Sequence, residues 1–352
     1  MDIRFEKREH LQEKPDQKNL GFGKHFTDYM FVMDWDKEQG WHDAAIVPYG
    51  GIPMDPATMV LHYAQETFEG MKAYRTAEGK IQLFRPEMNA RRMIKSNERL
   101  CMPGVPEEMF VEAVKALVKA QEDWVPSEPG TSLYIRPFMF ATGDVIGVKP
   151  ATEYQFRILV TPVGPYYKGG VKPVKLQVPE FDRAAPHGTG NIKAGLNYAM
   201  SLHPSVIAHS KGYADNLFLD PQTRTYVEET GGANVLFVKK DGTLVVPQSF
   251  TDSILPSITR RSLVDVAEKM LGMTVEQRPV RFDEIDQFVE CGMCGTAAVI
   301  SPVGQIDNGD KSVVYGMEHV GPVMKKLRET LTGIQSGAIE DQFGWVHKID
   351  VE

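Results

Sequence analysis

Apolar residues in the first half of the chain follow two different periods, and each period predicts a different kind of element. The run IQLF at 81–84 predicts a short strand, and Pro86 is then placed to open a helix that continues over 87–102. A second helix is expected behind Pro106, because apolar residues recur there with the spacing of one helix face. These residues are Phe110, Val114, Leu117 and Val118.

The second half of the chain alternates between strand-like and helix-like segments. Two consecutive hairpins are predicted, with turns at Asp220-Pro221 and at Asp241-Gly242. Strands are also expected within 132–140, 156–163 and 174–180, and helices over 197–212, 257–270, 283–290 and 320–332. In the last of these helices Val320, Met324, Leu327 and Leu331 share one face.

A glycine- and proline-rich segment divides the chain near its middle. The total of 352 residues suits two domains. Residues 164–173, GPYYKGGVKP, contain three glycines and two prolines and predict an interdomain linker. Residues 1–20 are polar without periodicity and are expected to form an N-terminal arm. The two predicted domains are then 21–163 and 174–352.

Composition and charge narrow the possible partners. The chain has 39 basic and 47 acidic residues, a net charge of −8, which argues against a surface built for nucleic acid or anionic lipid. No run of 18 apolar residues is present, so no membrane span is expected, and the polar N-terminus does not resemble a signal peptide. Three cysteines suit a reducing compartment, so we expect a cytoplasmic protein.

The familiar phosphate and metal motifs are incomplete in this sequence. The segment GTGNIKAG at 188–195 has Lys193 where a dinucleotide motif needs glycine, and Ile192 where a Walker motif does. The histidines form no H-E-x-x-H pair, so no metal site is expected. Cys291 and Cys294 form a C-x-x-C that could be a redox pair, half a zinc site or two buried thiols; Cys101 stands alone.

Lys193 has an unusual setting, with three glycines in the eight residues 188–195. Glycine lets a backbone approach a planar ligand closely, and burial beside such a ligand lowers the pKa of a lysine toward the range in which it forms imines. A surface lysine remains an equal alternative on spacing alone.

Several segments together resemble the branched-chain amino-acid aminotransferases, a fold-type-IV pyridoxal-phosphate family. In family order they are FTDYMFVMDWDKEQGW, LHYAQETFEGMKAYR, LFRPEMNARRM, WVPSEPGTSLYIRP, GTGNIKAGLNYA, VEETGGANVLF and ILPSITRRSL, and they span about residues 20–335. The resemblance implies an α/β (α+β) fold with a small mixed α/β domain and a larger β-rich domain with flanking helices. It also implies pyridoxal 5'-phosphate as the cofactor.

The resemblance implies roles for three residues around the cofactor ring. Lys193 is the residue that forms the Schiff base and then moves the proton at the substrate Cα. Glu229 pairs with the pyridine nitrogen, which stays protonated beside a carboxylate. Strand alternation sends Glu228 to the opposite face, where it could be solvated. Tyr198 bonds the phenolic oxygen, unless it is an ordinary core tyrosine.

The phosphate is expected at a second group of residues. Arg92 resembles the phosphate-binding arginine, while Arg91 lies about 100° away around the helix and points elsewhere. Ile258 and Thr259 open a predicted helix, where unpaired backbone amides favour an anion. Thr296 adds a hydroxyl, although its segment could also be a plain apolar strand.

The substrate is expected in an aromatic, mostly apolar pocket with one polar feature. Its aromatic residues, each of which could instead be core, are Tyr63, Phe68, Tyr134 and Tyr166, with Phe22 as a further candidate. Arg136 in YIRP matches the arginine that receives the distal carboxylate of glutamate. The backbone amide of Ala297 is expected at the substrate carboxylate.

The implied activity is transamination of leucine, isoleucine and valine with 2-oxoglutarate, giving branched 2-oxo acids and L-glutamate in a ping-pong cycle through the Lys193 Schiff base. The resemblance also implies a homodimer. It does not rank the three amino acids or separate biosynthesis from breakdown.

Two alternative functions remain. One is D-amino-acid transamination or aminodeoxychorismate lysis on the same fold, against which the motifs YIRP and FEGMKAY argue. The other alternative is a protein that binds the vitamin-derived cofactor but does not turn over a substrate. The redox C-x-x-C of mammalian members aligns with Ala298 and Ser301, so that switch is not expected.

Overall fold

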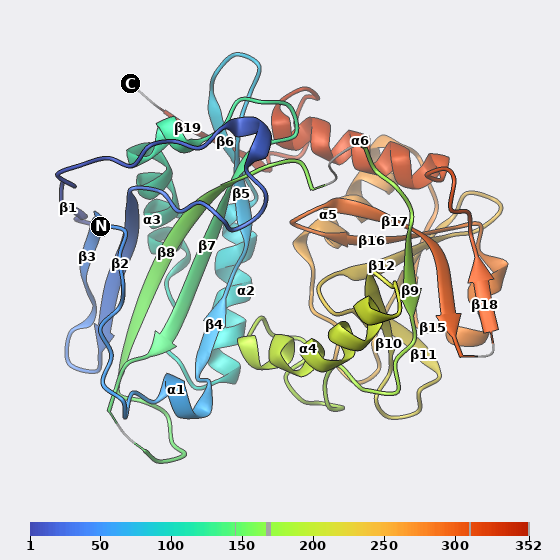
Figure 1. Ribbon diagram of the computed structural model, residues 1–352, viewed down its shortest axis with the longest axis horizontal. Helices are drawn as coiled ribbons and strands as arrows, with labels where there is room; N and C mark the ends of the chain where they lie inside the picture. Colours follow the sequence, from blue (N-terminus) through green and yellow to red (C-terminus); the bar gives the residue numbers. More distant parts are fainter. Residues whose placement is uncertain (145, 167–169, 310, 351–352) are drawn as a thin grey trace. The chain divides into compact units, whose positions relative to one another are not determined.

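The computed structural model describes residues 1–144, 146–166, 170–309 and 311–350, in which the chain forms two compact units (Figure 1). Unit 1 comprises Met1–Tyr166, Lys193–Gly195 and Gly333–Glu352, and unit 2 comprises Tyr167–Ile192 and Leu196–Thr332. The predicted second domain, 174–352, included the C-terminal segment that instead belongs with unit 1. Residues 167–169 of the predicted linker lie outside the described residues.

Unit 1 is built on one mixed sheet, which has nine strands in the described part of the chain. The strands are β1 (Arg4–Phe5), β2 (Tyr29–Asp36), β3 (Gly40–Pro48), β4 (Glu66–Phe68), β5 (Met71–Arg75), β6 (Ile81–Phe84), β7 (Ser132–Ala141), β8 (Glu153–Val163) and β19 (Val346–Ile349). Their order is β1-β3-β2-β8-β7-β5-β6-β19, with β4 paired to β7. The pairing of β19 with β6 is the reason that the C-terminus joins this unit.

The helices of unit 1 are α1 (Val60–Tyr63), α2 (Pro86–Arg99) and α3 (Glu107–Ala120), with 3-10 turns at Gln17–Asn19 and Glu122–Trp124. The predicted face of α3 is confirmed, since its four apolar residues are fully buried in one core with residues of β2, β7 and β8. Pro86 opens α2 as expected. The strand predicted at 81–84 is β6.

The first residues of the chain are more ordered than an arm. The strand β1 pairs in parallel with β3. Further along, the Gln12 backbone amide donates to the Asp28 carboxylate at 2.7 Å. Strands of two residues carry almost no periodicity, which explains why the sequence pattern shows no element here.

Unit 2 is built on a second mixed sheet, with ten strands in the described residues. They are β9 (Val174–Gln177), β10 (Asp215–Leu219), β11 (Tyr226–Thr230), β12 (Asn234–Val238), β13 (Leu244–Pro247), β14 (Val275–Arg278), β15 (Val280–Arg281), β16 (Glu290–Gly295), β17 (Val299–Asn308) and β18 (Lys311–Val314). The order is β14-β13-β12-β16-β17-β9-β10-β11-β15, and β11 also pairs with β12. This extra pairing closes the strands from β12 round to β11 into a ring. The two predicted hairpins are β10–β11 and β12–β13.

The helices that begin in the second half are α4 (Gly195–Ser210), α5 (Ile258–Asp265) and α6 (Pro322–Ser336). The predicted helix at 257–270 continues after α5 as a π-helical turn, Val266–Met270. The predicted helix at 283–290 is wrong at its end, since a 3-10 helix covers Phe282–Gln287 and β16 starts at Glu290. Val320 also lies outside α6, because Pro322 opens that helix. None of the helices in the described residues has the length and apolar character of a membrane span.

Candidate active site

Lys193 belongs to unit 1, where its backbone links α2 to β4. Its amide donates to Ser96 Oγ at 3.0 Å, and its carbonyl accepts from the Phe68 amide at 3.1 Å. Two residues later the Gly195 amide donates to the Glu66 carboxylate. The backbone around the lysine is thus anchored. The Lys193 Nζ lies 4.6 Å from the centre of the Phe68 ring.

The environment of the Lys193 amine favours its neutral form. Burial, together with the positive charge of Arg92, lowers its pKa to about 8, while Glu69 acts in the opposite direction. Neutral amines are the nucleophilic form of lysine, and burial beside another cation is a known means of activating them. Lys193 is therefore suited to covalent chemistry with a carbonyl group.

Arg92 lies inside unit 1, paired with a glutamate that the sequence pattern does not single out. Its Nε and Nη2 donate to the two oxygens of Glu69, each at 2.7 Å, and the Glu69 side chain is fully buried. Asn89 Nδ2 adds a hydrogen bond to the same carboxylate at 2.8 Å. Arg91 instead forms an exposed ion pair with Glu107, so the two neighbouring arginines do point in different directions, as predicted.

Phe68, Tyr134 and Arg136 form one cluster beside Lys193. The Arg136 guanidinium lies 4.7 Å from the centre of the Phe68 ring and 5.4 Å from that of Tyr134. Its Nη2 also donates to the Tyr134 hydroxyl at 3.0 Å. A Cβ on Gly70 would clash with that hydroxyl oxygen, so glycine is required for the tyrosine to take this position. The cluster combines two aromatic rings with one guanidinium that lies over both of them.

Three other predicted pocket residues of unit 1 are at its surface. Tyr63 in α1 is 38% exposed, Tyr166 is 57% exposed and Phe22 is 51% exposed. Phe22 has an edge-on contact with Tyr134, with the ring centres 5.0 Å apart. Unit 1 therefore brings Lys193, Arg92, Phe68, Tyr134 and Arg136 into one group and leaves these aromatic residues exposed.

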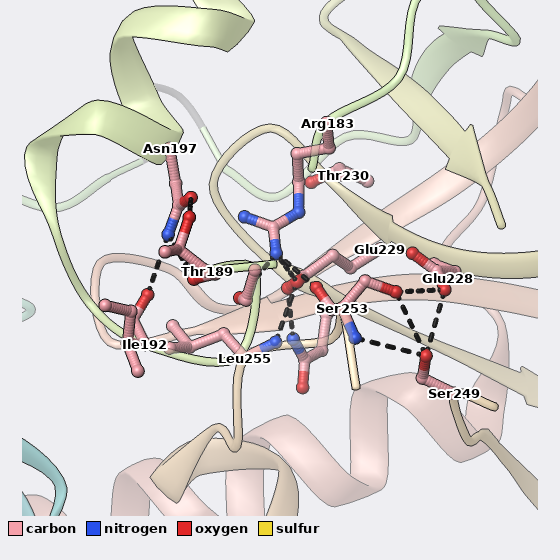
Figure 2. Close-up of polar contacts among 12 residues, drawn as sticks. Arg183, Thr189, Ile192, Asn197, Glu228, Glu229, Thr230, Ser249, Ser253 and Leu255 are labelled. Carbon is pink, nitrogen blue, oxygen red and sulfur yellow. Dashed lines mark hydrogen bonds and ion pairs between the residues drawn. The ribbon is translucent and has the colours of Figure 1, made fainter. Parts of the chain in front are cut away.

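Glu229 lies on β11 in unit 2, at the centre of a buried polar network (Figure 2). Its Oε1 accepts from the Leu255 amide at 2.8 Å and is 2.6 Å from Arg183 Nη2. Its Oε2 accepts from Asn234 Nδ2 at 2.7 Å. Burial raises the pKa of this carboxyl above its ordinary value, and Arg183, the Leu255 amide and Arg260 offset only part of that rise.

Glu228 is buried as well, so the expectation that it could be solvated is wrong. Its Oε1 accepts hydrogen bonds from Ser249 Oγ at 3.0 Å and from Ser253 Oγ (Figure 2). It also accepts from Thr251 Oγ1 at 3.2 Å. Strand alternation does separate the two glutamates, because Glu228 and Glu229 have different partners. The loop that contains the three hydroxyls covers Glu228 and leads into α5.

The start of α5 has the backbone geometry that favours an anion. Ser257 caps the helix, since its side chain accepts from the Arg260 amide at 3.1 Å. The Ile258 and Thr259 amides have no hydrogen-bond acceptor among the described residues, as is usual in a first helical turn. Two amides that point along the positive end of a helix dipole favour a phosphate.

The remaining predicted residues of unit 2 are partly exposed. Thr296 and Ala297 lie in the turn between β16 and β17, and Tyr198 lies in the first part of α4. Asn197 holds the segment before α4 in place, with Nδ2 bonded to the Thr189 carbonyl at 2.7 Å and the Ile192 carbonyl at 3.0 Å. Neither Asn197 nor Arg183 was singled out from the sequence. The only sequence feature that could have pointed to Arg183 is its position as a charged residue next to the small residues 184–186.

The C-x-x-C does not form a compact thiol pair. Cys291 and Cys294 are both buried on β16, and residues three apart on a strand project to opposite faces. Burial raises the pKa of Cys291 and raises that of Cys294 to about 12. No group of three or more metal-ligating side chains occurs in the part of the chain that the structure describes.

Comparison with known proteins identifies the family. The family model of amino-transferase class IV matches residues 66–306. The chain belongs to the class IV aminotransferases. A branched-chain-amino-acid aminotransferase of Haemophilus influenzae is 46% identical, with 95% of this chain and 99% of that protein aligned. The chain is thus an enzyme, a pyridoxal-phosphate-dependent aminotransferase.

Two solved structures show the same fold. The Thermobaculum terrenum branched-chain amino acid aminotransferase in its PLP form is 26% identical with a TM-score of 0.74, covering 92% of this chain and 99% of that one. A T.th. branched-chain amino acid aminotransferase complexed with N-(5'-phosphopyridoxyl)-L-glutamate is 26% identical with a TM-score of 0.73, covering 90% of this chain and 98% of that one. The fold expected from the sequence is therefore confirmed.

The residues of this aminotransferase fit its cofactor. Pyridoxal phosphate has an aldehyde, a basic ring nitrogen and a phosphate. Lys193 offers an amine whose pKa is lowered to about 8, and Glu229 offers a buried carboxylate. The start of α5 offers the backbone amides of its first turn. Each of the three cofactor groups has a chemically matched partner.

Proposed function

We propose that this aminotransferase moves the amino group of leucine, isoleucine or valine onto 2-oxoglutarate, giving branched 2-oxo acids and L-glutamate in two half-reactions. The observation that carries the proposal is the Lys193 amine, with its pKa near 8, in one group with Phe68, Tyr134 and Arg136. The name of the Haemophilus influenzae relative supports the branched-chain substrates. The glutamate conjugate in the solved T.th. structure supports glutamate as the other substrate.

Lys193 is proposed as the residue that holds the cofactor covalently and transfers the proton at the substrate Cα. When bound, pyridoxal phosphate supplies an electrophilic carbon and a ring that accepts electrons from Cα. Lys193 Nζ is available as a base for the proton transfer because burial and Arg92 keep much of it neutral near pH 8. A base whose pKa lies near the working pH serves both to accept and to return a proton.

Glu229 is proposed to face the pyridine nitrogen and Tyr198 the phenolic oxygen. The Glu229 carboxylate is held by two hydrogen bonds and one ion pair from three segments, so its position is determined before any ligand binds. A carboxylate at the pyridine nitrogen favours the protonated ring, which withdraws electrons more strongly. A hydroxyl hydrogen bond from Tyr198 would favour the phenolate and tune the acidity of the attached amine.

The phosphate is proposed to bind Arg92, the Ile258 and Thr259 amides and the Thr296 hydroxyl. Arg92 has two of its donors bonded to Glu69, so its guanidinium is fixed in direction. A fixed cation loses little conformational entropy when an anion binds.

The substrate pocket is proposed to consist of Tyr63, Phe68, Tyr134 and Tyr166, with Arg136 and the Ala297 amide as its polar groups. Aromatic walls accept an aliphatic side chain, and Arg136, whose guanidinium lies over the Phe68 ring, can receive the distal carboxylate of glutamate. Apolar walls combined with a single charged group let one pocket hold both side chains.

The test is a substrate panel with purified enzyme, pyridoxal phosphate and 2-oxoglutarate. We expect glutamate to form with L-leucine, L-isoleucine and L-valine, and not with D-alanine; aminodeoxychorismate should not be consumed. Lys193→Ala should abolish turnover, whereas Lys211→Ala, at an exposed lysine, should keep it. Preference for D-alanine, or cofactor binding without glutamate formation, would replace the proposal by one of its rivals.

The assembly and location of the enzyme are also proposed from the family likeness. We propose a cytoplasmic homodimer. Light scattering of the purified enzyme should give twice the mass of one chain. A concentration-independent monomer that retains full activity would contradict the dimer.

A further inference from the structure

The geometry points to Arg183 as a positioning residue that holds the Glu229 carboxylate in place. Arg183 lies in the loop after β9 and is 5% exposed. The inference rests on the role proposed for Glu229 at the pyridine nitrogen. It gives a role to a buried arginine that takes no direct part in the proposed proton transfer.

A single nitrogen of Arg183 serves three oxygens from three segments (Figure 2). Its Nη2 lies 2.6 Å from Glu229 Oε1, donates to the Gly190 carbonyl at 2.6 Å and donates to the Ser253 carbonyl. Gly190 belongs to the segment that runs on to Lys193, and Ser253 to the loop that leads into α5. Arg183 therefore joins the Glu229 strand to two segments that carry proposed cofactor contacts.

The backbone segments beside this nitrogen are closely packed. A Cβ on Gly190 would clash with the Ser253 carbonyl oxygen and would lie 2.8 Å from Ala184 Cβ. The two carbonyls are thus held close together, and Arg183 is the donor that satisfies both. Closely packed backbone segments with a shared donor keep a carboxylate within the small positional tolerance that catalysis requires.

The charges around Glu229 show why an arginine is needed. Burial raises the pKa of Glu229, and the nearby carboxylate of Glu228 adds to this effect, while Arg183 is the largest influence that lowers it. Arg260 on α5 lowers it less, and the buried thiol of Cys294 on β16 also faces this group. Without Arg183, the carboxyl would gain a proton more easily and would no longer oppose a protonated ring nitrogen with a full negative charge.

A purely structural arginine is the alternative, and a double-mutant cycle separates the two. The variants are Arg183→Met, Glu229→Gln and the double variant, and the primary measurement is the dissociation constant of pyridoxal phosphate. If Arg183 acts through Glu229, each single substitution weakens binding by about 10- to 100-fold, and the double variant is no weaker than Glu229→Gln alone. The inference would be overturned if the double variant lost affinity for pyridoxal phosphate by the product of the two single-variant losses.

The pH dependence of the bound cofactor gives a second readout that a structural role would not move. We expect the midpoint of the visible-absorbance titration in Arg183→Met to match that of Glu229→Gln. Arg183→Lys keeps the charge but not the planar fork, so it should return the midpoint to that of the wild type even if the melting temperature stays low. A wild-type midpoint in Arg183→Met would overturn the inference.

Arg281→Met is the matched control. Arg281 pairs with Asp283 at 2.7 Å on the surface, and its strand, β15, pairs with β11, which carries Glu229. Both the dissociation constant and the titration midpoint should stay within about twofold of the wild type, because exposed ion pairs contribute little.

The outcomes also separate this inference from the proposed function. A wild-type enzyme that binds no pyridoxal phosphate, or a Glu229→Gln variant with unchanged binding and titration, would refute the role of Glu229 and with it the inference. If Glu229→Gln has its expected effects and the Arg183 variants do not, only the inference fails. Should Arg183→Met not fold, the same comparison is made with Arg183→Lys and Arg183→Gln.

Discussion

Each unit of this aminotransferase contains a deeply buried arginine–glutamate pair, and the two pairs have opposite roles. In unit 1 the pair is Arg92–Glu69, at 2.7 Å, and the arginine is the proposed ligand-binding residue. In unit 2 it is Arg183–Glu229, at 2.6 Å, and there the glutamate is the proposed ligand-binding residue. In unit 1 Glu69 orients Arg92 and balances its charge. In unit 2 Arg183 does the same for Glu229.

The comparison teaches that a buried functional charge needs a dedicated counter-charge. A single charge in a protein interior loses its hydration and changes its protonation state unless a partner compensates. The surroundings differ in detail: Glu69 accepts from two side chains, Arg92 and Asn89, whereas Arg183 serves Glu229 and two backbone carbonyls. The first pair is therefore a local clamp, and the second joins several segments.

The largest expected effect is on stability when the unit 1 pair is broken. Glu69→Gln leaves Arg92 buried without its counter-charge and should lower the unfolding free energy of the cofactor-free enzyme by about 3–5 kcal/mol in urea titrations. Glu69→Gln combined with Arg92→Met should recover much of this loss. Glu107→Gln removes the exposed partner of Arg91 and should change stability by less than about 1 kcal/mol. Equal losses from Glu69→Gln and Glu107→Gln would contradict the comparison.

The next effect concerns the two adjacent glutamates of unit 2. Glu229→Gln should reduce kcat for leucine by about 100-fold, because a neutral amide cannot keep the pyridine nitrogen protonated. Glu228→Gln keeps an oxygen acceptor for the Ser249, Thr251 and Ser253 hydroxyls and should stay within about threefold of wild-type kcat. Steady-state kinetics at saturating leucine measures both. Similar losses in the two variants would show that the network as a whole, and not the Glu229 charge, is needed.

The third effect is a pH dependence of stability that Lys193 gives to unit 1. The Lys193 pKa is about 8 in the folded chain against an ordinary value of 10.5. Between these values the unfolded chain binds more protons, so this lysine should make the cofactor-free enzyme more stable as the pH rises from about 8 to 10.5. Relative to Lys193→Met, the rise should be on the order of 1–3 kcal/mol. The check is urea unfolding of both proteins across this range; parallel curves would refute a lowered lysine pKa.

The smallest effect concerns the aromatic wall beside the unit 1 pair. Gly70→Ala would bring a Cβ into a clash with the Tyr134 hydroxyl oxygen, so the tyrosine and its hydrogen bond from Arg136 must shift. We expect kcat/KM for leucine and for 2-oxoglutarate to fall by roughly 10-fold. Gly104→Ala is the control, since its Cβ would make an ordinary 3.6 Å contact with Ile94. Unchanged kinetics in Gly70→Ala would show that the position of Tyr134 is unimportant.

The two pairs also show which site residues are visible in the sequence. Arg92 and Glu229 can be recognised from the sequence, because each lies in a motif that resembles a motif of a known family. Glu69 and Arg183 were missed, although Glu69 stands in the middle of FEGMKAY. Glu69 and Arg92 are 23 positions apart, and no local period connects residues at such a distance. The burial of Glu228 was missed for the same reason, since its three hydroxyl partners come from a distant loop.

Local elements were predicted best where one short segment contained the whole signal. The strand at 81–84, the buried face of α3 and the two hairpins needed only alternation, helical spacing or a turn dipeptide. The domain boundaries remain a prediction, with the C-terminal segment placed by the β19–β6 pairing instead of by its sequence position.

The sequence by itself determined the family of this enzyme and the groups proposed for its chemistry. These are a lysine between glycines, an arginine on a helix face and a glutamate near a strand end, in motifs that match one family. The tertiary structure alone decided which groups surround them. It buried the Lys193 amine and placed Arg92 near it, lowering its pKa to about 8, and it placed Arg183 against Glu229. The physical reason is that protonation states depend on desolvation and on charges a few ångströms away, and neighbours in space need not be neighbours in the chain.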